Sequence, residues 1–187
     1  MSVLEYIILA FALSMPVMVI VRGCALKTPI RLTRGLAVSI LIAIEHVLLI
    51  LAGMYIGNML RFGFPEYDNL VYLGLLVVVA FRMVIPAFRK KEKELPAYDI
   101  SRWLTVLLLG IATGTNTLFV GLGLGFLVPL HPDALRASIP LAVVLFLMGY
   151  LGIMLGRTKK PVRARRWQLI AVLFLLVFAI KGAFFSS

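Results

Sequence analysis

Glu45 is the residue whose type and position most directly indicate chemistry in this chain. It lies inside an apolar run, Gly35 to Leu60, that contains no Asp, Lys or Arg, and its titratable neighbour there is His46. A carboxylate at the centre of a membrane helix costs about 2.5–3.5 kcal/mol on insertion scales. Such a group is paired, protonated or used to hold a cation. Glu45 therefore predicts a site that handles protons or cations.

Two further polar interruptions fall within apolar runs. Pro16 removes one helix hydrogen bond and frees a carbonyl one turn earlier, beside Ser14. In lipid, a freed carbonyl has to find a partner or line a polar cavity. Thr113, Asn116 and Thr117 are spaced i, i+3, i+4, so they share one face of a helix. We expect both interruptions to lie at a depth similar to that of Glu45.

Together these groups would supply carboxylate, amide, hydroxyl and carbonyl oxygens, a ligand set that suits hard divalent cations such as Mg²⁺ or Mn²⁺. We expect the cation ligands to be Glu45, Asn116, Thr113 and Ser14. We expect the substrate pathway to include Pro16, His46 and Thr117.

Structural alternatives stay open for the same residues. Ser and Thr in membrane helices can bond back to carbonyls of their own helix. An Asn such as Asn116 can join two helices by hydrogen bonds. His46 shares a packing face with Gly53 and Gly57, so it can simply hydrogen-bond a neighbour.

The elements that carry these residues are predicted to be membrane-spanning helices. The 187 residues are 62% hydrophobic, with mean hydropathy +1.05, whereas soluble domains are about 45–50% apolar. A membrane helix needs about 20 apolar residues, and six continuous runs meet this length. They are Val3–Val21, Gly35–Leu60, Leu70–Phe88, Trp103–Val128, Ala134–Gly156 and Trp167–Phe184. Transmembrane strands would instead alternate over about 10 residues. We expect an all-α integral membrane protein without a soluble domain.

The basic residues predict the orientation of these helices. Net charge is +11, and the Lys and Arg residues cluster after the first, third and fifth runs, whereas the opposite loops hold Arg61 and Arg136. The positive-inside rule then places both termini outside the cytoplasm. The excess of basic residues therefore indicates the topology of the helices, and it also attracts anionic lipid. We do not expect nucleic acid as a partner.

The two halves of the chain resemble each other at an offset of about 100 residues. The matched segments are Ala12–Pro16 with Ala112–Asn116, Gly53–Gly57 with Gly152–Gly156, and Ala80–Arg82 with Ala179–Lys181. Three spans in each half would insert the halves in opposite orientations, an arrangement found in secondary transporters with midplane sites. We expect residues 1–90 to form the first three-helix repeat, 91–101 a cytoplasmic linker, and 102–187 the second repeat.

Enzymatic signatures are absent from the sequence. It holds one cysteine, Cys24, no HExxH or CxxC spacing and no nucleophile–base constellation. The first residues lack a basic region and a cleavage pattern, so they indicate a retained first helix and not a signal peptide. We expect neither an enzyme nor a resident cofactor.

Several segments resemble the MntP-type manganese efflux pumps. The first run, LAFALSMPVMVIVRG, is similar to the opening helix of that family, and Glu45 with the later Gly53–Gly57 is similar to its second helix. The segments Phe81–Ile85 and Ile111–Leu124 resemble its third and fourth helices. The resemblance implies a small multi-pass protein of the bacterial inner membrane with six helices in two repeats, and it implies manganese export.

The sequence departs from this family at two symmetric positions. Pro16 and Asn116 stand where the family has aspartates expected to carry the metal. A hard cation is held mainly by charge and oxygen count, so a site that keeps one carboxylate would bind Mn²⁺ more weakly.

The expected function is cation efflux, coupled to protons through Glu45, with the two three-helix repeats rocking about a midplane site. One alternative is export of a different small solute on the same scaffold. Another is a non-transporting protein that binds a partner or lipid through its basic loops. Expected partners are the bilayer and the transported Mn(II), other divalent cation or small solute, and a homo-oligomer is left open.

Overall fold

The computed structural model describes residues 3–28, 30–63, 68–88, 98–127, 130–158 and 169–177, and the regular structure in these ranges is helical. Five long helices follow one another along the chain, and residues 169–177 form a sixth helical stretch. The long helices are α1 (Val3–Lys27), α2 (Leu32–Arg61), α3 (Asp68–Phe88), α4 (Trp103–Leu127) and α5 (Leu130–Arg157). The prediction of an all-α fold is confirmed.

Five of the described helices are long and apolar enough to cross a membrane. They coincide with the first five predicted runs to within a few residues at most ends. Half of the sixth predicted run, Trp167–Phe184, lies outside the described residues, as do residues 91–97 of the predicted linker. The chain is a multi-pass helical membrane protein.

The first helix is longer than the apolar run that predicts it. The run ends at Val21, whereas α1 continues to Lys27 and encloses Arg22 as a buried residue. The backbone N–H and the hydroxyl of Thr28 both donate to the Cys24 carbonyl at 2.9 Å and close the last turn. A helix ends where its backbone hydrogen bonds end, and this point need not coincide with the edge of the apolar segment.

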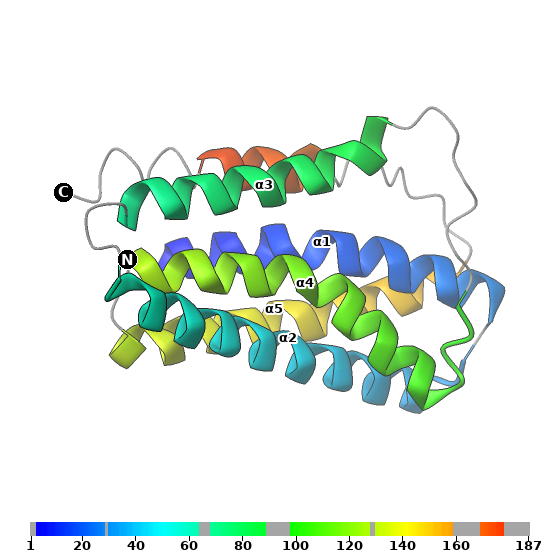
Figure 1. The fold of residues 1–187 in the computed structure, drawn as a ribbon. Helices are drawn as coiled ribbons and strands as arrows, with labels where there is room; N and C mark the ends of the chain where they lie inside the picture. Colours follow the sequence, from blue (N-terminus) through cyan, green and yellow to red (C-terminus); the bar gives the residue numbers. More distant parts are fainter. Residues whose placement is uncertain are drawn as a thin grey trace.

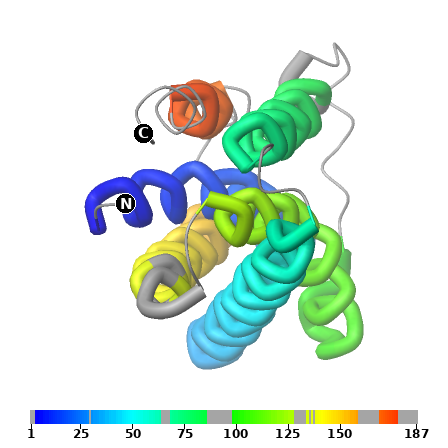
Figure 2. Tube along the Cα trace, turned by 60° about the vertical axis from the view of Figure 1, so that its left-hand side comes forward, coloured from blue at the N-terminus to red at the C-terminus, as the bar shows by residue number. Residues whose placement is uncertain are grey.

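The helices form three layers (Figures 1 and 2). The middle layer contains α1 and α4. One outer layer contains α3 and residues 169–177, and the other contains α2 and α5. Each layer therefore combines one helix from each half of the chain.

Helix direction alternates along the chain, so α1 and α4 run in opposite senses, as do α2 and α5 (Figure 1). The closest packing joins α2 to α4 and α1 to α5. The contacts between α2 and α5 and between α3 and α4 are less extensive, and those between α1 and α4 are few. Both of the tightest pairs therefore join one half of the chain to the other.

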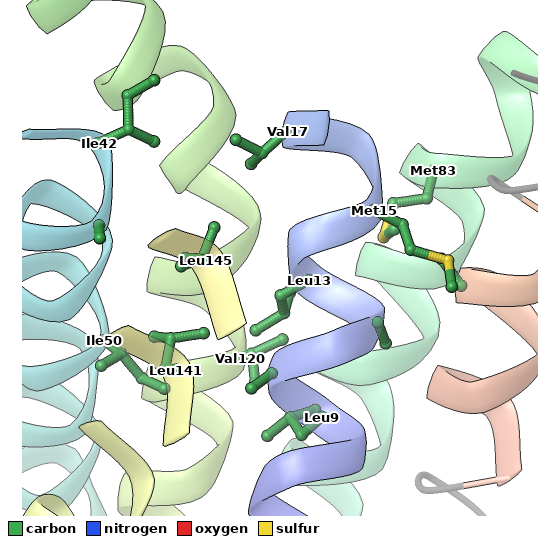
Figure 3. Packing of buried hydrophobic residues seen from close by; sticks show 14 of the residues in the cluster. Leu9, Leu13, Met15, Val17, Ile42, Ile50, Met83, Val120, Leu141 and Leu145 are labelled. Carbon is green, nitrogen blue, oxygen red and sulfur yellow. The ribbon is translucent and has the colours of Figure 1, made fainter. Parts of the chain in front are cut away.

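A continuous apolar core lies between the layers (Figure 3). Leu9 and Leu13 of α1 point toward Val120 of α4, and Met15 of α1 points toward Met83 of α3. All five side chains are buried. These contacts place the polar residues of α1 and α4 among tightly packed apolar neighbours.

The segment before α4 is held against the start of α2. Arg34 donates a hydrogen bond to the Ser101 carbonyl, and its guanidinium lies 4.7 Å from the ring centroid of Trp103. The Ser101 backbone N–H donates to Asp99 at 3.0 Å, which holds the pKa of that exposed carboxyl below its ordinary value. These contacts set where α4 begins beside α2.

Candidate functional site

The carboxylate of Glu45 lies against α4 at Gly110. The Glu45 side chain is 9% exposed, and a Cβ atom added at Gly110 would overlap its Oε2 atom. Both carboxylate oxygens are buried and have no hydrogen-bond partner among the residues that the structure describes. A side chain at position 110 would therefore require the Glu45 carboxylate to move.

His46 lies against the next turn of α4. The side chain is fully buried, and its Nδ1 is 2.9 Å from the Ile42 carbonyl oxygen. A carbonyl can only accept, so Nδ1 carries the hydrogen and Nε2 keeps its lone pair. That Nε2 is also buried without a partner within the described ranges. The ring lies 3.6 Å from the point that a Cβ on Gly114 would occupy.

Gly110 and Gly114 are four residues apart on α4, and together they form a surface that we call the glycine shelf. Residues at i and i+4 lie one above the other on a helix, about 6 Å apart along its axis. The shelf therefore accommodates the side chain of Glu45 at Gly110 and that of Leu49 at Gly114, with the His46 ring beside Gly114.

The predicted hydroxyl ligands bond within their own helices. Ser14 donates to the Phe11 carbonyl at 2.9 Å, and Thr113 donates to the Leu109 carbonyl at 2.8 Å. Each hydroxyl keeps lone pairs that can still accept a hydrogen bond or bind a cation. Thr117 is buried, at 1% exposure.

Asn116 is half-buried, and its Oδ1 has no hydrogen-bond partner in the described part of the chain. Pro16 is half-buried within α1, which continues as a helix on both sides of it. Asn116 and Thr113 belong to the helix that carries the glycine shelf, whereas Ser14 and Pro16 come from α1 in the same layer. The described contacts bring Glu45 and His46 to one surface and leave Ser14 on another helix.

The described residues contain no larger cluster of acidic and imidazole groups than Glu45 and His46. Within the described ranges, no three His, Cys, Asp or Glu side chains lie close enough to hold a metal ion together. A cation at the glycine shelf would be bound by Glu45 and His46, with further ligands from amide, hydroxyl or carbonyl oxygens.

The sequence interpretation did not single out Gly110. The feature that could have identified it is the pair of glycines four residues apart in LLLGIATGTN. That spacing is also found wherever two membrane helices pack through small residues, so it does not indicate a site. The acid that Gly110 faces lies 65 positions earlier in the chain, so only helix pairing shows that the glycine makes room for a carboxylate.

Three polar groups without partners in an apolar interior require an explanation. Buried polar atoms in proteins are nearly always hydrogen-bonded, and an unpaired one costs about 1–3 kcal/mol, or more when it is charged. Glu45, His46 and Asn116 supply such atoms on two adjoining helices. A proton or cation bound at the glycine shelf would satisfy Glu45 and His46, and this is the chemistry that the arrangement supports; Asn116 lies on another face of α4, two residues after Gly114.

Comparison with known proteins gives a consistent result. Residues 29–182 match the family model described as "Putative manganese efflux pump". Proteins named "Putative manganese efflux pump MntP" from Yersinia pestis (strain Pestoides F) and Yersinia pseudotuberculosis (serotype O:1b, strain IP 31758) are each 25% identical over 178 residues. The alignments cover 94% of this chain and 92% of each relative. No solved structure matches the chain. The match spans most of the chain, including the helices that carry Glu45 and the glycine shelf, and the chain belongs to the MntP manganese efflux pump family.

Proposed function

We propose that this protein is a secondary transporter that exports divalent cations across the bacterial inner membrane in exchange for protons bound at Glu45. The observation that carries this proposal is the buried carboxylate of Glu45, whose two oxygens have no partner in the described part of the chain. Family membership supports the same function, because the bacterial relatives are named manganese efflux pumps.

Contacts of the glycines on α2 support an inverted repeat. A Cβ atom on Gly53 would collide with the Leu118 carbonyl of α4, and one on Gly57 would collide with the Leu122 carbonyl. Each is a contact of backbone with backbone, which only glycine permits. The two helices are therefore held at their closest approach along this face.

The same contacts recur in the other half of the chain. A Cβ atom on Gly152 of α5 would lie 2.6 Å from the Met18 carbonyl oxygen of α1, and one on Gly156 would lie 2.7 Å from the Arg22 carbonyl oxygen. These four positions follow or precede their counterparts on α2 and α4 by 99 or 100 residues. Together with the opposite helix directions in Figure 1, this correspondence supports two halves related by inversion.

The packing also suggests which helices move together during transport. Backbone contacts unite α2 with α4, and α3 packs on α4. The corresponding contacts unite α1 with α5, and the rings of Phe11 and Phe174 bring residues 169–177 onto α1 with centroids 6.4 Å apart. We call α2, α3 and α4 the first body, and α1, α5 and residues 169–177 the second body. Each body combines helices from both halves of the chain.

The face between α2 and α5 joins the two bodies. An apolar groove of about 440 Å³ opens between these helices. The groove is lined by Ile40, Ala43, Ile44, Val47, Leu48, Ala142, Val143 and Phe146. The groove between α2 and α5, set against the backbone contacts that unite α2 with α4 and α1 with α5, favours alternating access by movement of one body along the other.

Energetics require that export be coupled to another gradient. An inward-negative potential opposes cation exit by about 2.3 kcal/mol per charge per 100 mV, or about 4.6 kcal/mol for a divalent ion. A carboxylate that binds either a proton or a cation can exchange one for the other. Proton entry would then drive cation exit through Glu45.

The test is transport by purified protein in lipid vesicles that carry a pH gradient. Glu45→Gln keeps the shape of the side chain and removes its charge, so we expect proton-driven cation flux to fall at least 100-fold. Asp99→Asn makes the same chemical change on an exposed connector and should leave flux unchanged. Wild-type flux in the Glu45→Gln protein would contradict the proposal.

A further inference from the structure

We infer that Glu45 and His46 form one mixed oxygen–nitrogen site on the glycine shelf, and that this site selects borderline divalent transition metals such as Zn²⁺, Fe²⁺ and Co²⁺ over hard Mn²⁺ and Mg²⁺. The inference rests on the proposed function, because it concerns the cargo of the same site. It assigns to His46 a ligand role that decides specificity.

The hydrogen bond to Ile42 gives His46 the form that a metal requires. Metal-binding histidines usually donate their other ring N–H to a carbonyl or carboxylate, which fixes the tautomer and the ring orientation. His46 makes this contact at 2.9 Å, and its Nε2 is left as a buried lone pair without a partner in the described residues. A histidine serving only to join helices would use both nitrogens or turn one toward a donor.

Glu45 and His46 are consecutive residues of α2, and both lie against the face of α4 that carries the glycine shelf. The carboxylate lies at Gly110, and the imidazole passes beside Gly114, with Cε1 3.6 Å and Nδ1 3.7 Å from the Cβ position there, behind the closer Leu49 Cδ1. Metal bonds to carboxylate oxygen and imidazole nitrogen are about 2.0–2.2 Å long, so the two donors of one ion lie roughly 3–4 Å apart. The flexible Glu45 side chain can close the remaining distance by a change of rotamer, because neither oxygen is held by a hydrogen bond among the described residues.

The charge of the site argues against a hard cation. The two helices that face each other in the middle layer carry Pro16 and Asn116, and Glu45 is the one acidic residue of α2. Mg²⁺ and Mn²⁺ prefer carboxylate, carbonyl and water oxygens, whereas imidazole suits Zn²⁺, Fe²⁺, Cu²⁺ and Ni²⁺. Compared with a site of several carboxylates, a site with one carboxylate and one neutral imidazole therefore binds hard ions much more weakly, whereas its affinity for borderline ions falls less.

The decisive measurement is how His46 affects metal preference. Most sites with nitrogen and oxygen ligands favour Zn²⁺ over Mn²⁺, so the ratio of affinities in the wild type is not diagnostic by itself. We expect His46→Gln to lower the Zn²⁺-to-Mn²⁺ affinity ratio at least tenfold, and His46→Asp to lower it further by adding a second carboxylate. Titration of the full-length protein in detergent, with Zn²⁺ and Mn²⁺ each alone, gives both affinities.

Cobalt provides a readout that does not depend on transport. Co²⁺ bound to wild-type protein should show visible absorption bands that shift in His46→Gln and disappear in Glu45→Gln. His46→Asn, a smaller replacement, covers the case in which His46→Gln fails to fold. Monodisperse elution of each variant establishes that it is folded before metal is added.

The outcomes separate this inference from the proposed function. An unchanged affinity ratio and unchanged cobalt bands in a folded His46 variant would overturn the ligand role of His46, while cation export through Glu45 would stand. Absence of any divalent-cation flux in wild-type vesicles would overturn the proposed function, and with it the inference. A fall in the Zn²⁺-to-Mn²⁺ affinity ratio of the His46 variants, with Mn²⁺ flux retained, supports both the proposed function and the ligand role of His46.

Discussion

Glu45 and Gly110 depend on each other. The carboxylate occupies the space that a side chain at position 110 would fill, so any larger residue there would displace the acid. A carboxylate in this position is shielded from lipid and is 9% exposed, yet its oxygens stay free for a ligand. The glycine of the partner helix thus gives the acid the space that it occupies.

Gly110→Ala should displace the Glu45 carboxylate without altering any ligand. A shift of about 1 Å in a reacting group can reduce rates about 100-fold, so we expect cation flux to fall by about 10- to 100-fold. Gly74→Ala is the matched control, because nothing among the described residues lies within 4 Å of a Cβ there. Flux in vesicles compares the two variants, and equal flux would show that the shelf does not position Glu45.

At the scale of helices, two glycine faces decide which elements pair. Gly53 and Gly57 bring α2 onto α4, while Gly152 and Gly156 bring α5 onto α1. In a bilayer there is little hydrophobic force between helices, so close backbone approach supplies the packing energy. The pairs that form are those with complementary small residues, and neither pair joins neighbours in the sequence.

Gly53→Ala should weaken the α2–α4 pair. The added methyl group would meet the Leu118 carbonyl and the backbone of Gly121, and overpacking of this kind costs about 1–3 kcal/mol. Gly74→Ala, on an open face of α3, should instead be neutral or stabilise the helix by up to about 1 kcal/mol. Thermal unfolding in detergent measures both changes, and a Gly53→Ala protein as stable as the control would show that the backbone contact contributes little.

At the scale of the whole molecule, the bodies that pack together differ from the halves of the sequence. If the sequence halves moved as units, a bond between α3 and α4 would lock transport. If the first and second bodies move as units, that bond is harmless, and a bond between α2 and α5 locks transport. Two disulfides of similar geometry distinguish these mechanisms.

Both cross-links can be built in a Cys24→Ala background. Ser39→Cys with Gly149→Cys joins α2 to α5 at a Cβ–Cβ distance of 3.5 Å, and Leu75→Cys with Gly123→Cys joins α3 to α4 at 3.7 Å. Both fall within about 3.5–4.5 Å, the range of natural disulfides. We expect oxidation to abolish flux in the first variant, with recovery on reduction, and to leave flux in the second within about twofold. Loss of flux on oxidising the Leu75–Gly123 pair would favour movement of the sequence halves.

Several properties of this protein can be predicted from its sequence alone. The five described spans and their membrane insertion follow from local hydropathy, because the bilayer imposes the length of each span. The family resemblance was carried by short segments such as Ile111–Leu124 and is confirmed by the match over residues 29–182. These properties need no knowledge of which helix lies beside which.

Helix partners and the environment of Glu45 emerge only in three dimensions. Hydropathy is nearly the same on every face of these helices, so it does not indicate that α2 pairs with α4 or that Glu45 meets Gly110. The role of His46 changes for the same reason: a residue on a packing face proves to hold a buried, unpaired nitrogen beside Gly114 among the described residues. Pairing depends on the fit of small-residue surfaces far apart in the chain, and that fit exists only after the helices assemble.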